Sequence, residues 1–383
     1  MKILKIKCSG FKLLKDNFEI SFDAGKGNKL PNNDNELLKE GDHCFFNALS
    51  ILIGMNCSGK TTILELIELC NLLIENGRIP YQKEMFGKDK IDLEILFVVD
   101  NTLYKYSCVI KYSPEHVSFN NNYCLLLNQK LSSKNLYRVN DIYDQRRSFT
   151  PVNINNPKDL DSYCIIKYLN FRPRICLSIE KPATNIYQLI RKFLKMAPYI
   201  GDETLVTILN LFGYDVETIK LINEDYVEAT LENGDSIYKP IAEIVEYVTV
   251  GSMRGALTYA YALLAIKLGA TLIADEIDAC LNKQIVEEIV SMFFNKSVNK
   301  KQASIVYSTH NPSLLDLTNK TNNINIVHKN TNGKIEIVPF TAFCPTRLRV
   351  AQSKIYKESS FYVSPKEQYL KKINQIALKF NNK

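Results

Sequence analysis

The chain has 383 residues, 46% of them hydrophobic, and a formal net charge of +7. This length and composition are sufficient for a folded protein with a large core. No apolar run reaches the about 18 residues that a membrane span needs, and the first residues lack a secretion signal, so we expect a cytoplasmic protein without a membrane partner. The ten cysteines occur singly and only four histidines accompany them, which argues against a disulfide framework and a structural zinc site.

The positive charge is concentrated at the C-terminal end. Residues 346–383 contain nine basic and two acidic residues, whereas the rest of the chain has 39 of each sign and is formally neutral. Binding of DNA or RNA would therefore depend on this basic tail for its attraction to the phosphate backbone. The alternative is a lysine-rich terminal helix exposed to solvent.

The N-terminal part alternates between strand-like and helix-like patterns. A continuous apolar run at 48–53 predicts a strand covered on both faces, and apolar residues at helical spacing over 61–73 predict the helix that follows it. A polar loop precedes this strand up to about residue 43. The other strands expected here, from alternating hydrophobicity and turn residues, are 3–8, 18–22, 92–99 and 103–112.

The middle of the chain is irregular, and regular alternation returns near Gly251. The middle contains Asn-rich loops and helical patterns at 186–196 and 204–211, without sustained heptads that would predict a long coiled coil. The later helices are expected at 256–268 and 283–294, and the later strands at 271–274, 304–307, 324–328 and 335–339. We therefore expect one α/β domain with a mixed central sheet and antiparallel strands. Its parts are the halves 1–114 and 241–345, an α-rich insertion at 115–240 and the basic tail 346–383.

Residues 54–61 match the phosphate-binding (Walker A) pattern G-x-x-x-x-G-K-[ST] between a predicted strand and a predicted helix. The glycines allow a nest of N–H groups around phosphate oxygens, and the helix N-terminus adds partial positive charge. Lys60 would reach the β- and γ-phosphates, and Thr61 would bind magnesium. The alternative is a glycine-rich turn without a ligand. The residues predicted to bind ATP are Gly54, Asn56, Ser58, Gly59, Lys60, Thr61 and Thr62.

Polar groups also follow two predicted buried strands. Asp275 and Glu276 come directly after 271–274, at the edge where open α/β sheets bind ligands. Asp275, with Thr61, would hold Mg²⁺, and Glu276 would orient and polarise the attacking water. His310 follows the next strand and would contact the γ-phosphate or the water. The predicted catalytic residues are thus Lys60, Glu276 and His310; the alternatives are a carboxylate pair that merely ends a strand and a bystander histidine.

The segments GMNCSGKTT, TLIADEID and YSTHNPSLLD together resemble the ATP-binding-cassette (ABC) heads of the RecF/SMC type. They are most similar to compact bacterial ATPases of the abortive-infection (AbiL/RloA) and OLD kind. These proteins carry a Phe-Arg-Ser-Phe-like turn between their first two strands, where this chain has Gly10, Phe11 and Lys12. The resemblance covers about residues 1–112 and 240–340, and it implies a P-loop NTPase fold of the ABC type.

The resemblance also implies a homodimer or higher oligomer in which each ATP is completed by a signature segment of the other subunit. The family's Leu-Ser-[Ser/Gly]-Gly corresponds to Thr249, Val250 and Gly251, where valine replaces a serine. This departure suggests slow turnover more than lost binding, and a plain helix N-terminus is the alternative. Gln82 is a candidate for the family's magnesium-contacting glutamine, and Asp278 corresponds to a position where subunits contact each other.

The function implied by the resemblance is an ATPase whose nucleotide-dependent dimerisation senses or clamps nucleic acid and controls a partner, in bacterial anti-phage defence. Only about 70 residues follow His310, so the effector, a nuclease or toxin, would be separately encoded. The alternatives are a weakly hydrolysing regulatory scaffold and a RecF-like ATPase of DNA repair or recombination. The gap of about 215 residues between Lys60 and Asp275, together with the lack of an intact LSGGQ, argues against a transporter ATPase.

Overall fold

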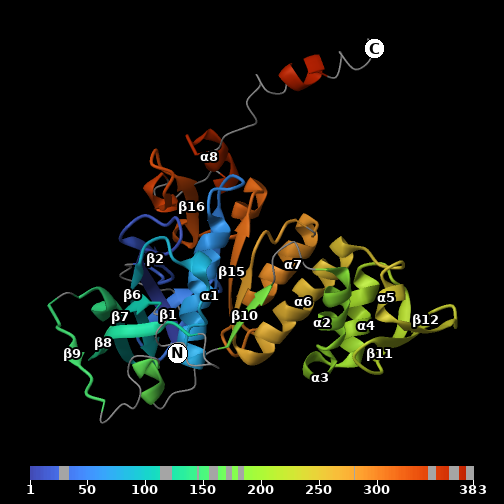
Figure 1. Ribbon diagram of the computed structural model, residues 1–383, viewed down its shortest axis with the longest axis horizontal. Helices are drawn as coiled ribbons and strands as arrows, with labels where there is room; N and C mark the ends of the chain where they lie inside the picture. The colour runs from blue at the N-terminus through green and yellow to red at the C-terminus, as the bar shows by residue number, and fades with distance from the viewer. Residues whose placement is uncertain are drawn as a thin grey trace.

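The computed structural model describes most of the chain. The described residues are 1–25, 34–112, 123–144, 146–154, 163–169, 175–179, 185–279, 281–343, 351–361 and 371–376. Two six-stranded sheets, a helical lobe with a small sheet, and a C-terminal helix make up this part of the protein (Figure 1).

The central sheet has the strand order β10-β14-β15-β5-β16-β17. The first five strands are parallel and β17 is antiparallel to β16. Every residue of β5, β14 and β15 is buried, as the continuous apolar runs predict for strands covered on both faces. The strand bounds are Cys176–Ile179 (β10), Thr271–Ala274 (β14), Ser304–Thr309 (β15), Leu49–Ile53 (β5), Ile324–Lys329 (β16) and Ile335–Pro339 (β17).

Helices cover both faces of the central sheet (Figure 1). On one face α1, Lys60–Asn76, packs in one cluster with Leu52 and Val306. On the other face α6, Val250–Leu268, and α7, Lys283–Phe294, pack in a second cluster with the alternate residues of the same strands. Helix α1 is thus fixed against the sheet whose strand β5 leads into the glycine-rich loop.

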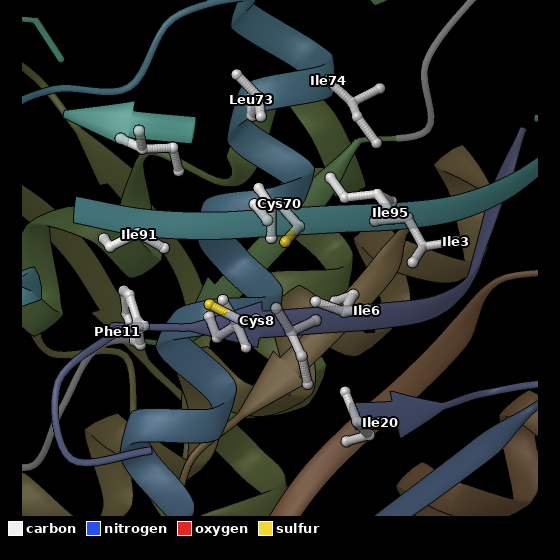
Figure 2. Packing of buried hydrophobic residues seen from close by; sticks show 14 of the residues in the cluster. Ile3, Ile6, Cys8, Phe11, Ile20, Cys70, Leu73, Ile74, Ile91 and Ile95 are labelled. Carbon is white, nitrogen blue, oxygen red and sulfur yellow. The ribbon is translucent and has the colours of Figure 1, made fainter. Parts of the chain in front are cut away.

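A second, antiparallel sheet lies on the other side of α1, with the strand order β2-β1-β6-β7-β8-β9. Its core-facing side chains, such as Ile6 and Ile95, pack against Cys70, Leu73 and Ile74 of α1 (Figure 2). The strands are Phe18–Ser21 (β2), Lys2–Ser9 (β1), Lys90–Val99 (β6), Thr102–Lys111 (β7), Leu125–Asn135 (β8) and Thr150–Pro151 (β9). Helix α1 is therefore buried between two sheets, and its buried residues are mostly apolar.

The third part is a lobe in which short helices and a three-stranded antiparallel sheet pack around α6. Phe193, Leu209 and Val227 lie in its core together with Met253 and Ala256 of α6. Its helices are Ile186–Leu194 (α2), Ala197–Ile200 (α3), Asp202–Leu211 (α4) and Ile241–Ile244 (α5). Its strands are Val216–Leu221 (β11), Tyr226–Leu231 (β12) and Ser236–Pro240 (β13).

The remaining elements are small. Strand β3, Leu37–Glu40, lies in the segment that we expected to be a loop, and it forms a hairpin with β4, Cys44–Asn47, which follows that segment. Short 3₁₀ helices are Lys83–Met85 (η1), Val139–Tyr143 (η3), Ile165–Tyr168 (η4), Pro312–Leu317 (η5), Thr321–Asn323 (η6) and Phe340–Ala342 (η7). Within the described residues, no helix combines the length and the apolar character needed to cross a membrane.

The expected mixed α/β sheet is confirmed, but the range 115–240 does not form one separate unit. Strand β8 pairs with β7 and extends the N-terminal sheet, and β10 pairs with β14 at the edge of the central sheet. The lobe itself contains the sheet β11-β12-β13, which the expectation of an α-rich insertion omitted. The Asn233-Gly234 pair between β12 and β13 is a strong sequence signal for a hairpin. The strands on either side of it are short, with six residues in β12 and five in β13.

The C-terminal segment is not exposed to solvent throughout, as a plain tail would be. Helix α8, Gln352–Glu358, packs on η5, where Gln352 donates to the carbonyl of Thr318 at 3.0 Å and Tyr356 is buried. A further helical stretch at 371–376 is exposed. Four of the basic residues counted in the tail lie in these two stretches, and the others lie outside the described residues: Arg347, Arg349, Lys366, Lys379 and Lys383.

The eight described cysteines are all free, and the buried ones serve as small core residues. Cys8, Cys70 and Cys108 lie in the cluster between α1 and the N-terminal sheet. Burial raises the pKa of the Cys8 and Cys108 thiols to about 12 and that of Cys70 well above its usual value. Cys57, in the phosphate-binding loop, is exposed. Reactivity should therefore differ sharply between these sites, because the thiolate is the nucleophile.

Iodoacetamide should alkylate Cys57 in the native protein long before Cys8, Cys70 and Cys108. A pKa of about 12 leaves on the order of 1000-fold less thiolate than an unperturbed cysteine, and burial also blocks access. Peptide mass spectrometry after timed exposures measures the order of labelling, with urea-unfolded protein as the control. Labelling of the buried three at the rate of Cys57 would contradict this packing.

Candidate functional site

The loop between β5 and α1 requires its two outer glycines. A Cβ atom on Gly54 would come within 2.3 Å of the carbonyl oxygen of Val327, and one on Gly59 would come within 2.4 Å of the Ile335 side chain. Gly59 also has φ of 108°, in the left-handed region, and Cys57 has φ of 62°. No side chain caps the N-terminus of α1, so its first N–H groups are available to bind an anion.

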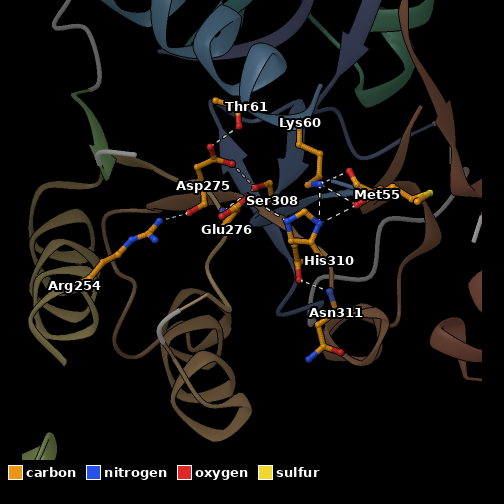
Figure 3. Close-up of polar contacts among 11 residues, drawn as sticks. Met55, Lys60, Thr61, Arg254, Asp275, Glu276, Ser308, His310 and Asn311 are labelled. Atoms are coloured by element: carbon orange, nitrogen blue, oxygen red, sulfur yellow. Dashed lines mark hydrogen bonds and ion pairs between the residues drawn. The ribbon is translucent and has the colours of Figure 1, made fainter. Parts of the chain in front are cut away.

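Lys60 is the first residue of α1 and is 4% exposed. Its ammonium donates to the carbonyl oxygens of Gly54 and Met55, both at 2.9 Å, and lies 3.0 Å from Nδ1 of His310 (Figure 3). Burial lowers the pKa of Lys60 to about 8, and the nearby carboxylates of Glu276 and Asp275 oppose this effect. A buried ammonium at the start of a helix without a side-chain cap is suited to bind a phosphate.

Asp275 follows β14 and is held by three other segments of the chain. Thr61 donates its hydroxyl hydrogen to Oδ2 of Asp275 at 2.6 Å, and Ser308 donates to Oδ1 at 2.5 Å. The Asp275 carbonyl oxygen accepts a hydrogen bond from Arg254 of α6 at 3.0 Å. The two residues predicted to bind magnesium, Thr61 and Asp275, are therefore in direct contact (Figure 3).

Glu276 and His310 face each other beside Lys60. Nε2 of His310 lies 3.1 Å from Oε1 of Glu276, and Nδ1 lies close to both Lys60 and the Gly54 carbonyl. The contacts with Glu276 and Lys60 match the tautomer in which Nε2 carries the hydrogen and donates to Glu276, while Nδ1 accepts from Lys60. In this tautomer Nδ1 makes no hydrogen bond with the Gly54 carbonyl oxygen, which accepts from Lys60. Both side chains are about one-third exposed, 33% for Glu276 and 32% for His310, so a ligand or water can reach them.

These contacts bring together Lys60, Thr61, Asp275, Glu276 and His310, which the sequence places in three distant segments. They meet at the C-terminal edge of the parallel strands β5, β14 and β15. Among the described residues, no cluster of three or more His, Cys, Asp or Glu side chains could hold a metal on its own. Mg²⁺ is typically held by one or two protein groups together with substrate phosphates, and Thr61 and Asp275 fit that requirement.

Asn56, Ser58 and Thr62 are the other loop residues predicted to bind ATP. Asn56 is exposed and Thr62 is half-buried next to Thr61. Ser58 is 7% exposed, and its hydroxyl oxygen has no hydrogen-bond partner among the described residues.

The predicted signature residues lie at the N-terminus of α6. Thr249 caps the helix by accepting a hydrogen bond from the Ser252 N–H at 3.1 Å, and Val250 and Gly251 follow in its first turn. Within the part of the chain that the structure describes, no hydrogen bond joins them to the phosphate-binding loop. Arg254 on the same helix does reach the site, because it contacts Asp275.

Two further candidates are not joined to the site by hydrogen bonds. Gln82 is exposed and precedes η1, where its carbonyl accepts the Met85 N–H. Asp278 lies three residues after Asp275, and its Oδ1 is buried with no hydrogen-bond partner among the described residues. Sequence reasoning missed Ser308 and Arg254. The available signal for Ser308 was a small hydroxyl-bearing residue at the C-terminal end of a buried strand, close to His310.

Similarity to known proteins is found at the level of solved structures. No family model matches this chain, and no curated protein matches its sequence. Among solved structures, the SMC head domain from Thermotoga maritima is similar, with a TM-score of 0.43 and 13% identity over 88% of this chain and 99% of that chain. Similarity at this level carries no functional argument, so the interpretation of the site depends on its own geometry.

The lowered pKa of Lys60 predicts a pH-dependent stability that Lys60→Met removes. Between pH 8 and 10 the unfolded lysine remains protonated and the folded one loses its proton, so the free energy of unfolding rises with pH. The free energy of unfolding of the wild type should rise by about 1 kcal/mol per pH unit relative to that of Lys60→Met in this window. Below about pH 7 the difference between the two proteins should not change with pH. Urea unfolding of both nucleotide-free proteins at pH 7, 8, 9 and 10 measures the difference, and a constant difference would contradict the assignment.

Proposed function

We propose that this protein is an ATPase of the ABC type that binds Mg·ATP on residues 54–61 and hydrolyses it slowly. The observation that supports this proposal is the meeting of Lys60, Asp275, Glu276 and His310 at one edge of a parallel sheet. A glycine-rich turn without a ligand would not need a buried ammonium, a hydroxyl–carboxylate pair and a glutamate–histidine pair around it. This combination favours phosphate binding with water activation.

Each side chain then has a defined task. Lys60 and the first N–H groups of α1 bind the β- and γ-phosphates and neutralise charge that develops on them. Thr61 and Asp275 would hold Mg²⁺, which would supply Lewis-acid chemistry at the nucleotide phosphates. Glu276 accepts a hydrogen bond from the attacking water and orients it, and the Nε2–H of His310 holds the glutamate carboxylate in place or donates to the γ-phosphate.

We propose a homodimer in which the N-terminus of α6 completes the nucleotide site of a second copy. Thr249 and Gly251 stand at the start of this helix, and Val250 is 45% exposed beside them. A helix N-terminus attracts phosphate oxygens, so this end could bind the γ-phosphate of a partner's nucleotide. The hydroxyl of Thr249 already accepts the Ser252 N–H, and valine offers no donor, which supports slow turnover.

The same observation favours a second candidate function, a regulatory scaffold that binds ATP and hardly hydrolyses it. Its dimer would persist and present a fixed surface to the effector. A RecF-like role in DNA repair shares every residue of the site, so the choice between repair and anti-phage defence depends on the partner. We favour defence, with a separately encoded nuclease or toxin as the effector.

Nucleic acid would bind away from the helical lobe. Residues 186–250, from the start of α2 to the start of α6, contain 11 acidic and five basic residues, a net charge of −6 within a chain of +7. Phosphate backbones are repelled by such a surface. DNA or RNA would instead contact the remaining, strongly basic part of the protein, including the C-terminal tail.

The substitution Glu276→Gln tests the enzymatic function. It should lower the steady-state ATPase rate by about 100-fold or more, because the amide cannot accept the water proton, while ATP binding persists. Glu287→Gln on α7, an exposed glutamate paired with Lys283, is the matched control and should turn over like the wild type. Equal background rates in the wild type and Glu276→Gln would favour the scaffold.

Removal of residues 362–383 tests the tail without disturbing α8, which is packed against the core. The deletion takes away five lysines and one glutamate. It should weaken DNA binding and reduce the slope of log affinity against log salt by up to about 4, while ATP binding is unchanged. Fluorescence anisotropy with labelled DNA at several salt concentrations measures this slope. An unchanged slope would mean that the tail is a solvent-exposed segment that does not bind DNA.

A further inference from the structure

Ser308, near the end of β15, contacts both carboxylate residues of the site. Its side chain is fully buried, at 0% exposure. The hydroxyl donates to Oδ1 of Asp275 at 2.5 Å and accepts the N–H of Glu276 at 2.8 Å, and the Ser308 carbonyl accepts the N–H of Ile277 at 3.1 Å. One residue thus holds three consecutive residues of the turn after β14.

The first of these contacts fixes the orientation of the Asp275 carboxylate. Its two oxygens are held from opposite elements, Oδ1 by Ser308 of β15 and Oδ2 by Thr61 of α1. Without Ser308 the carboxylate could rotate about its side-chain torsion, and Oδ1 would be left buried without a donor. Mg²⁺ demands near-ideal octahedral geometry from its oxygen ligands, so its affinity is sensitive to this rotation.

The second contact fixes Glu276. This residue has φ of 50°, a left-handed conformation that costs a non-glycine residue on the order of 1 kcal/mol. The hydrogen bond from its N–H to Ser308 stabilises that conformation. The same turn directs the Glu276 carboxylate to Nε2 of His310, two residues after Ser308.

We propose that Ser308 is the positioning residue of the magnesium–nucleotide site, which aligns Asp275 for the cation and Glu276 for the water through one buried hydroxyl. This inference rests on the proposed function. Ser308 touches neither substrate nor cation in this role, and acts through the two carboxylate residues. Removal of its hydroxyl should therefore weaken Mg²⁺ binding while the contacts of Lys60 with phosphate remain.

The test compares Ser308→Ala with Ser304→Ala. Ser304 lies at the opposite end of the same strand, is 3% exposed, and hydrogen-bonds to Lys2, so its loss removes a similar buried contact far from the site. A fluorescent ADP analogue is titrated against each protein without Mg²⁺, and Mg²⁺ is then titrated at a fixed analogue concentration. The free energy of unfolding of each variant is measured in parallel.

In Ser308→Ala the Mg²⁺ concentration at half-saturation should rise by about 10- to 100-fold, the usual effect of losing a group that orients a metal ligand. Its Mg²⁺-free affinity for the analogue should stay within about 2-fold of the wild type, since Lys60 and the loop are intact. Ser304→Ala should match the wild type in both quantities even where it is equally destabilised. Turnover at saturating Mg²⁺ should also fall in Ser308→Ala, because Glu276 is no longer held.

Three results would overturn or redirect the inference. A Ser308→Ala protein with wild-type Mg²⁺ dependence refutes the positioning role but leaves the proposed function intact. A wild type that binds the analogue with no effect of Mg²⁺, or not at all, refutes the proposed function itself. If Ser308→Ala does not fold, Ser308→Val, which also removes the hydroxyl and suits a buried strand, gives the readout, and an unshifted Mg²⁺ dependence there refutes the role equally.

Discussion

Parallel pairing of β15 with both β5 and β14 is the constraint on which the site depends. Ile53 is paired with Thr309, and Ala274 with Tyr307, so the three strands end at nearly the same level of the sheet. The residues that follow each strand end are therefore neighbours, although Lys60 and Thr61 are more than 200 positions in the chain from His310 and Asp275. A one-residue slip of β15 would turn Ser308 to the opposite face and away from Asp275.

This pairing is stable because both faces of the strands are covered. The residues of β5 alternate between two clusters: Leu52 packs under α1, whereas Leu49, Ile51 and Ile53 pack under the helices on the other side. Helix α1 in turn is enclosed by the N-terminal sheet. Packing thus fixes the position of the loop residues at both of its ends, through β5 before the loop and α1 after it.

Much of this arrangement could be predicted from the sequence, because the strands of the central sheet are continuous apolar runs. The run at 48–53 and the helical pattern after it predicted β5 and α1 within a few residues. The contact of Thr61 with Asp275 followed from the rule that ligands bind at the C-terminal edge of such a sheet. These patterns are local, and the secondary structure that they predict depends little on distant residues.

The features that could not be predicted depend on three-dimensional packing. Strands β11, β12 and β13 are short and rich in polar residues, and they are stabilised by packing on α2, α4 and α6, which the sequence pattern does not reveal. The role of β10 as an edge strand also required knowledge of its partner, β14. Ser308 is one of many serines, and only the register of β15 against β14 places its hydroxyl between Asp275 and Glu276.

Backbone strain near the site provides independent support for its importance. Eight described residues other than glycine have positive φ, and four of them are Asn or Asp, the types that tolerate this conformation in turns. The other four are Lys12, Cys57, Glu276 and Gln302, and two of these lie at the site: Cys57 in the glycine-rich loop and Glu276 directly after Asp275. Such strain persists only where the surroundings over-determine it. At Glu276 the surroundings are the buried sheet edge and the hydroxyl of Ser308, so the packing that imposes this conformation is the same packing that positions Asp275.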